Sequence, residues 1–213
     1  MANSVNSVKG VLKTSNVAHS RSTSNAKASN KTGTTSKSKS VNMSKQSAAS
    51  AISRAKSQIG IAEATGNNDG AKIVEYRFGQ RGNIPWCSSF ANWCYNPDHS
   101  GMNIFGLSDK DVKSSQKVLR AAKKYDCLYS APKVGDAIIW TTNGDASHGH
   151  VGLVSEVRSD GSFVTIQGNS NNKVERISYS SLSSAKTRIN SEGKSQTLQG
   201  FARIPKYYSS QKK

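Results

Sequence analysis

Acidic and aromatic residues are missing from the first part of this chain. The first acidic residue is Glu63 and the first aromatic residue is Tyr76, whereas ten lysines and arginines lie in residues 1–62. A segment with little to bury and charge of one sign cannot form an ordinary core. The net charge of +17 is therefore concentrated toward one end of the 213 residues, and a folded domain is expected only further along.

Long apolar runs are also absent from the sequence. No run approaches the length of a membrane-spanning helix, and residues 1–16 lack the apolar core of a secretory signal. We therefore expect a protein that is made in the cytoplasm without a signal peptide or a membrane span. If it acts outside the cell, another route has to release or deliver it.

Cysteines are few. The three cysteines stand at positions 87, 94 and 127, and none of them forms a C-x-x-C pair. The odd number and the spacing argue against a disulfide framework and against a zinc ribbon. Each cysteine is thus expected to be either a packing residue or a reactive thiol.

The composition changes near Ser47. Residues 1–46 consist mainly of Ser, Asn, Thr and Lys and are low in complexity, which predicts a disordered basic tail. Residues 47–213 are predicted to form one domain. Its first half has helical spacing, and we expect helices over 47–60, 71–79, 87–95 and 108–125, the last starting at a capping box formed by Ser108 and Asp111.

The second half of the domain has a different pattern. After Pro132, short segments rich in β-formers alternate with turn residues. Helices that are followed by an antiparallel meander predict an α+β domain in which the N-terminal helices pack on one sheet. The predicted strands are 135–142, 150–157, 162–168, 174–180 and 200–204.

Cys87 lies in the stretch IPWCSSFANWCY, residues 84–95. Pro85 marks a helix start, so that Cys87 falls in the first turn, where free N–H groups and the helix dipole favour a thiolate. Phe90 and Cys94 follow on one face of this helix, which predicts that Cys94 is a packing residue. The residues alone leave open whether Cys87 belongs to the same apolar stripe, because free cysteines are often buried.

A nucleophilic cysteine needs a base. Of the four histidines, His19 lies in the tail, His99 in a predicted turn, and His148 in a predicted exposed loop. His150 opens the strand HVGLVSEV, and Gly152 on the same face leaves space beside it. We therefore predict that His150 is the base.

The base in turn needs a group that orients its ring. Gln167 and Asn169 have the same parity on the next predicted strand, so either amide oxygen could accept the imidazole N–H. Asn169 also belongs to GNSNN, which is typical of a turn.

Four segments together resemble the CHAP family of cysteine, histidine-dependent amidohydrolases and peptidases. They are NNDGAKIVEYRFGQRGNIPWCSSFANWCY, APKVGDAIIW, GHVGLVSEV and VTIQGNSNN, and the resemblance covers most of residues 47–205. It implies a papain-like α+β fold and cleavage of peptidoglycan amide bonds. It also implies that Cys87 is the nucleophile, His150 the base and Asn169 the orienting residue.

This chain departs from the family pattern in two places. Many members carry Glu two residues before that Asn, whereas this chain has Gln167, which weakens the support for an imidazolium. Some relatives bind calcium through aspartates near the cysteine, but the turn GNNDG offers only Asp69, which is too little carboxylate for a calcium loop. We expect no metal and no other cofactor.

The resemblance predicts a peptidoglycan hydrolase that acts at the bacterial cell wall. The activity would be that of an N-acetylmuramoyl-L-alanine amidase or of a stem or cross-bridge endopeptidase, in a phage endolysin, a tail-associated lysin or a delivered effector. The alternative is a non-catalytic structural or interaction component of a phage-like particle. Residues 1–46 would dock on anionic wall polymers or on a phage or secretion particle. They would bind nucleic acid at most nonspecifically, because they offer no aromatic side chain for stacking on bases.

Overall fold

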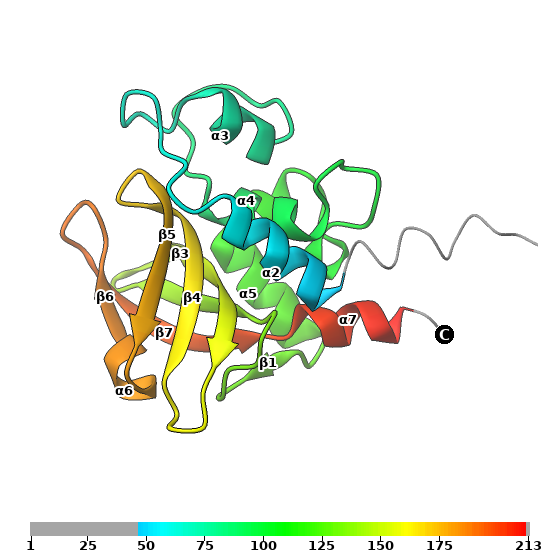
Figure 1. Ribbon diagram of the computed structural model, residues 1–213, viewed down its shortest axis with the longest axis vertical. Coiled ribbons are helices and arrows are strands. Elements are labelled where there is room, and N and C mark those ends of the chain that lie inside the picture. The colour runs from blue at the N-terminus through cyan, green and yellow to red at the C-terminus, as the bar shows by residue number, and fades with distance from the viewer. Residues whose placement is uncertain (1–46, 212–213) are drawn as a thin grey trace, which may run out of the picture. The chain divides into compact units, whose positions relative to one another are not determined.

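Helices precede strands along the chain, as the sequence predicted (Figure 1). The computed structural model describes residues 47–211, and the predicted tail of residues 1–46 lies outside the described residues. The elements are α2 (Ala48–Ser57), α3 (Ala71–Tyr76), α4 (Cys87–Tyr95), the 3-10 helices η1 (Ile104–Gly106) and η2 (Asp111–Lys113), α5 (Ser115–Lys124), β1 (Leu128–Tyr129), β2 (Ala137–Thr142), β3 (Asp145–Val157), β4 (Phe163–Ser170), β5 (Lys173–Tyr179), α6 (Leu182–Ala185), β6 (Thr187–Ile189), β7 (Ser195–Ala202) and α7 (Ile204–Ser210).

The strands form one antiparallel sheet. Its order is β1–β7–β2–β3–β4–β5, and β6 pairs with β7 beside this path. Strands β2 to β5 are consecutive neighbours, as expected of a meander, while β7 returns to lie beside β2. The fold is therefore the predicted α+β arrangement of helices on an antiparallel sheet.

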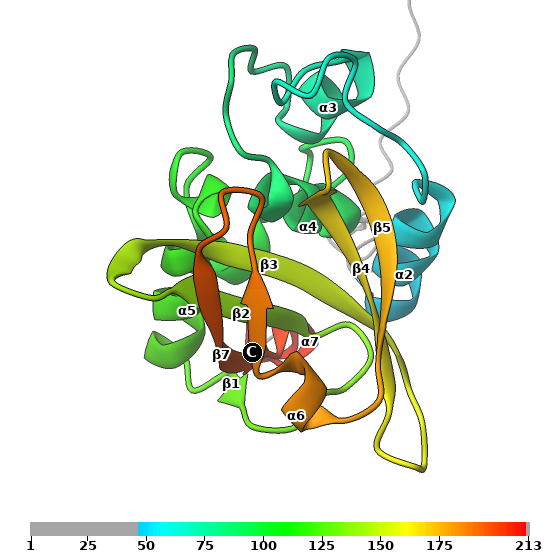
Figure 2. The ribbon, with the colours of Figure 1, turned by 90° about the vertical axis from the view of Figure 1, so that its left-hand side faces the viewer.

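Both faces of the sheet are covered. On one face, Ile139, Leu153 and Ile166 belong to a core that the helices α2, α4 and α5 close, and Figure 1 shows these helices on one side of the strands. On the opposite face, which is turned toward the viewer in Figure 2, Ile138 and Trp140 belong to a second core beneath α6. Two buried faces explain why β2 reads as a continuous apolar run rather than an alternation.

The helix starts follow from capping side chains. Ser47 accepts a hydrogen bond from the Ser50 backbone N–H at 3.1 Å, so α2 begins where the sequence predicted. The predicted start of the 108–125 helix is wrong. Ser108 does accept from the Asp111 N–H at 3.2 Å, but the 3-10 turn that follows ends at Ser114, which has an extended backbone and itself caps α5.

Two other boundaries differ from the sequence prediction. β2 and β3 pair as far as Thr142 and Asp145, so His148 lies in an extended strand and not in a loop. The predicted strand 200–204 is the end of the longer β7, and α7 begins at Ile204 with Pro205 in its first turn. None of the helices within residues 47–211 is long and apolar enough to span a membrane.

Candidate active site

Cys87 is the first residue of α4, as the position of Pro85 predicted. Proline disfavours a helical residue before it and is well placed where a helix begins. The opposite face of α4 is anchored in the core, because Phe90 and Cys94 are fully buried. The helix therefore holds Cys87 at its N-terminal end. Cys94, two turns further on, is a packing residue of the core.

The Cys87 sulfur lies between α4 and β3. The residue is only 7% exposed, and the backbone N–H groups of Val151 and Ser88 favour the thiolate form of the sulfur. Burial raises the pKa of the Cys87 thiol, and these N–H groups together with the charge of Arg188 offset part of that rise. The lowered pKa that the sequence predicted is wrong, because the desolvation of a buried thiolate outweighs the helix dipole. The resting group is a thiol.

His150 lies on β3, the strand whose Val151 N–H acts on the Cys87 thiol. It precedes Val151 in β3 and lies opposite Trp140 of β2, with the two ring centroids 5.9 Å apart. The residue is 5% exposed, and its Nε2 lies 2.9 Å from Oε1 of Gln167. Within residues 47–211, no hydrogen bond joins the His150 ring to the Cys87 sulfur. Such contacts often tighten only when substrate binds.

The Gln167 amide fixes the tautomer of His150. Its Nε2 donates to the Thr165 Oγ1 at 2.8 Å and to the Tyr179 hydroxyl at 3.0 Å, so that its oxygen faces the imidazole. His150 Nε2 must then carry the hydrogen and donate it. In the neutral ring this leaves the lone pair on Nδ1, which is the atom a general base needs.

The charge state of His150 follows from its burial. Burial lowers the pKa of His150 well below its usual range, the charge of Arg188 lowers it further, and the hydrogen bond to Gln167 opposes them. The imidazole is therefore neutral near pH 7. A neutral thiol and a neutral base with Nδ1 free make up the resting pair.

β3 and β4 separate at the end of the sheet where the site lies. Their pairing starts at Leu153 and Ile166, although β3 begins earlier and β4 continues further. The start of α4 fills the opening, and Gly168 lets it approach, because a Cβ there would lie 2.7 Å from atoms of both Phe90 and Trp86. The separation leaves the backbone of β3 beside Cys87 free to contact the sulfur.

The space that the sequence predicted beside His150 is filled by a side chain. A Cβ on Gly152 would lie 2.6 Å from Cγ of Gln167. Gly152 therefore allows Gln167 to reach His150 across the opening between the strands. A larger residue at this position would displace the amide that holds the imidazole ring.

Within residues 47–211, Asn169 makes no hydrogen bond to His150, in contrast to the sequence prediction. Its Oδ1 accepts the Trp86 backbone N–H at 3.0 Å, and its Nδ2 donates to Asn68 Oδ1 at 2.9 Å. The prediction relied on strand alternation. The pairing of β4 with β5 is irregular between Gln167 and Ser170, and Asn169 has a φ of 55°. This break turns Asn169 away from His150 and toward the start of α4.

A second polar residue joins this network, and the sequence analysis missed its role. Glu63 Oε1 accepts from the Trp86 indole N–H at 2.7 Å and from Asn169 Nδ2 at 3.0 Å, while its Oε2 accepts from the Asn68 N–H at 2.7 Å. Glu63 thus ties the loop before α3 to the residue that precedes Cys87. The only sequence signal was that Glu63 is the first acidic residue of the chain.

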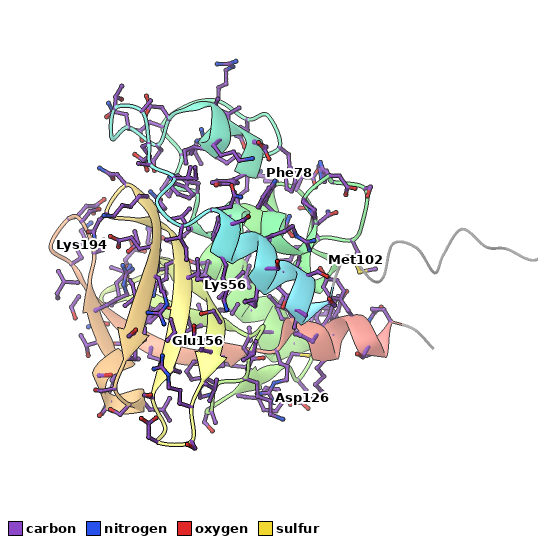
Figure 3. The ribbon with its side chains drawn as sticks, viewed as in Figure 1. Lys56, Phe78, Met102, Asp126, Glu156 and Lys194 are labelled. Atoms are coloured by element: carbon purple, nitrogen blue, oxygen red, sulfur yellow. The ribbon has the colours of Figure 1, made fainter. Side chains whose placement is uncertain are left out.

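Arg188 is the other site residue that sequence reasoning did not identify. It lies on β6, is half-buried, and its charge acts on both Cys87 and His150. Nothing in the local sequence marks it, because β6 reaches the site only through its pairing with β7. The turn between these strands contains Lys194, which is labelled in Figure 3.

The remaining predicted residues lie apart from this pair. His148 Nδ1 lies 2.6 Å from a carboxylate oxygen of Asp145 at an exposed position, and His99 Nε2 lies 2.8 Å from one of Asp109. Asp69 accepts from the backbone and side chain of Thr65, both at 2.9 Å. No cluster of three or more His, Cys, Asp or Glu side chains within residues 47–211 could hold a metal ion.

Several solved structures resemble this one. An N-acetylmuramoyl-L-alanine amidase from Staphylococcus aureus is 18% identical with a TM-score of 0.33, over 54% of this chain and 30% of that one. Ly7917 with the hydrolysing product of MDP is 16% identical with a TM-score of 0.40, over 72% of this chain and 63% of that one. The structure of Ly7917 alone is 15% identical with a TM-score of 0.37, over 72% of this chain and 62% of that one. The chain thus spans less than two thirds of each. No curated protein matches the chain.

A family model covers the part of the chain that holds the pair. Residues 79–169 match the model of the CHAP domain. This range includes α4 with Cys87, the strand β3 with His150, and both Gln167 and Asn169. This part of the chain is therefore similar to a CHAP domain.

Proposed function

We propose that this protein is a peptidoglycan hydrolase that cleaves an amide bond by acyl transfer to a cysteine. Cys87 is the nucleophile and His150 the general base. The observation that carries the proposal is the neutral His150, which Gln167 holds through Nε2, on the strand whose Val151 N–H acts on the Cys87 thiol at the start of α4. The similarity to a CHAP domain around this pair supports the substrate class.

The reaction starts from uncharged groups. His150 Nδ1 takes the proton of the Cys87 thiol as the sulfur attacks the carbonyl carbon, which gives a tetrahedral oxyanion and an imidazolium. The backbone N–H groups in the first turn of α4 are directed toward the N-terminal end of the helix, where they stabilise the oxyanion. The imidazolium then gives its proton to the leaving amine, the C–N bond breaks, and water releases the acyl group from sulfur by the same steps.

Gln167 and Asn169 have different tasks in this proposal. Gln167 orients the imidazole and accepts its N–H, which Asn169 was predicted to do. Asn169 instead positions the start of α4 through the Trp86 N–H. Gln167 carries no charge, so it stabilises the imidazolium less than a carboxylate would.

The proposal includes two candidate bonds and a place of action. The scissile bond is either the amide between muramic acid and L-alanine or an amide within the stem or cross-bridge. The protein acts at the bacterial cell wall as a phage lysin or a delivered effector. The basic residues 1–46 dock it on anionic wall polymers or on the particle that carries it.

Digestion of purified peptidoglycan followed by mass spectrometry tests the proposal. Peptides that begin with L-alanine, released from intact glycan, identify an amidase, and new termini within the peptides identify an endopeptidase. The Cys87→Ala variant should release neither. If the wild-type protein releases nothing while Cys87 reacts no faster with iodoacetamide than Cys94 and Cys127, the domain is a non-catalytic component and the proposal is wrong.

A further inference from the structure

Arg188 is held at the site by one of its donors. It lies opposite Gln196 in the pairing of β6 with β7, and its Nη1 donates to Gln196 Oε1 at 2.8 Å. Gln196 in turn donates to the Thr142 hydroxyl at 2.9 Å and is buried. The guanidinium is therefore fixed to the end of the sheet by a buried amide. Within residues 47–211 no further hydrogen bond engages its other N–H groups, so that they can bind a ligand.

The guanidinium also lies against the aromatic group next to the base. Its Cζ is 5.6 Å from the centroid of the Trp140 ring, and that ring lies 5.9 Å from the ring of His150. Arg188, Trp140 and His150 thus form a row on one face of the sheet. The charge at the end of this row acts on the Cys87 sulfur as well as on the imidazole.

No carboxylate neutralises Arg188 within residues 47–211. Tyr179 and Glu175 of β5 interact with it electrostatically, but the carboxylate of Glu175 is paired with Lys173 at 3.1 Å. Keeping a partly desolvated cation without a counterion costs free energy. A guanidinium with open donors matches a carboxylate in geometry, and a carboxylate on the substrate would supply the missing charge.

We propose that Arg188 is a substrate-binding residue that holds a carboxylate of the peptidoglycan stem peptide beside the scissile amide. The identity of the ligand rests on the proposed function, because stem peptides are the source of that carboxylate. Because its charge reaches the Cys87 sulfur, Arg188 is a determinant of specificity for acidic over amidated stems.

Alkylation of Cys87 tests this without any peptidoglycan. Iodoacetate and iodoacetamide are of similar size, and only the former carries a carboxylate. In the wild type, the rate ratio of iodoacetate to iodoacetamide at Cys87 should be high. In Arg188→Gln it should fall about tenfold, the size expected for the loss of one charge-assisted hydrogen bond. A change in the thiol pKa affects both reagents, so the ratio isolates the carboxylate contact.

Two further variants serve as controls for this experiment. Arg188→Lys keeps the charge and should retain most of the ratio, even if loss of the contacts to Gln196 and Trp140 lowers the stability of both variants. Arg120→Gln removes the same charge from an exposed position on α5 and should leave the ratio as in the wild type. An unchanged ratio in a folded Arg188→Gln variant would overturn the proposal.

Soluble muramyl peptides then test the ligand. With free carboxylates the wild type should show a lower KM than with the same peptides amidated, and Arg188→Gln should lose this difference while kcat changes little. A preference that persists in Arg188→Gln would overturn the assignment to the stem peptide. If no peptide is cleaved although Arg188 controls the alkylation ratio, the proposed function fails and the carboxylate site stands.

Discussion

The imidazole of His150 is oriented by a neutral amide, and this choice sets both its tautomer and its charge. Gln167 receives the Nε2 hydrogen and has its own N–H groups satisfied by Thr165 and Tyr179. An amide held in this way cannot rotate to offer a donor to the ring. The amide therefore keeps Nδ1 available for the thiol proton without adding a charge that would favour the imidazolium.

Removing the amide should disable the base. We expect Gln167→Ala to lower kcat by about a hundredfold, because the ring can then adopt the wrong tautomer. The measurement is turnover of a soluble muramyl peptide, with thermal unfolding as a check on folding. A nearly silent Gln167→Ala together with a stable but inactive Asn169→Ala would return the orienting role to Asn169.

Replacing the amide by a carboxylate should move the pH profile. In Gln167→Glu a negative charge faces the ring, favours the imidazolium and raises the pKa of His150. Since the base must be unprotonated, the acidic limb of kcat/KM should move to higher pH, while activity at neutral pH holds or rises. An acidic limb that stays in place would show that His150 does not set it.

Alanine substitutions of the two cysteines of α4 should have different effects, one on catalysis and the other on stability. Cys87→Ala should abolish peptidoglycan cleavage and leave the melting temperature near that of the wild type. Cys94→Ala should leave much of the activity but lower the free energy of unfolding by about 1 kcal/mol, since it removes a fully buried side-chain atom. Urea unfolding and peptidoglycan digestion measure both effects. A stable but inactive Cys94→Ala variant would show that Cys87 is not the nucleophile.

At the scale of elements, the site is assembled where β3 and β4 separate and α4 enters between them. Asn169 holds this junction through the Trp86 N–H, and Glu63 holds both residues. Asn169→Ala leaves a backbone N–H and part of a carboxylate without partners, so we expect a loss of about 1–3 kcal/mol in the free energy of unfolding. Denaturant titration measures it.

A control and a second readout make this prediction specific. Asn67→Ala removes an exposed hydrogen bond to Thr65 in the same loop and should change stability by no more than about 0.5 kcal/mol. Glu63→Gln keeps an acceptor and should cost less than Glu63→Ala. Equal losses in Asn67→Ala and Asn169→Ala would show that the network does not anchor α4.

How far the sequence predicts these elements depends on whether their signals are local. The start of α4 follows from Pro85, and the strand of His150 follows from its β-forming residues, so both were predicted. The contact of Asn169 was missed because the break of alternation after Gln167 depends on pairing with β5. Arg188 was missed because it reaches the site through strands that are distant in sequence.

At the scale of the whole molecule, charge is divided unevenly along the chain. Residues 1–62 carry ten basic and no acidic side chains, whereas the rest carries twenty basic and thirteen acidic ones. Within the described part, many acidic groups are already engaged, as Asp136 is with Arg203 at 3.0 Å. The excess positive charge of residues 1–46 is thus the part best suited to bind an anionic polymer.

Deleting residues 1–46 should therefore separate binding from folding. The melting temperature should stay near that of the full chain, because those residues contain almost no apolar surface to bury and α2 starts with its own cap at Ser47. Association with whole cell walls should weaken, and the difference between the two proteins should shrink as salt screens the charges. Cosedimentation with walls at several salt concentrations measures this. A large drop in the melting temperature would show that the tail packs on the domain. A difference in binding that does not change with salt concentration would rule out docking by charge.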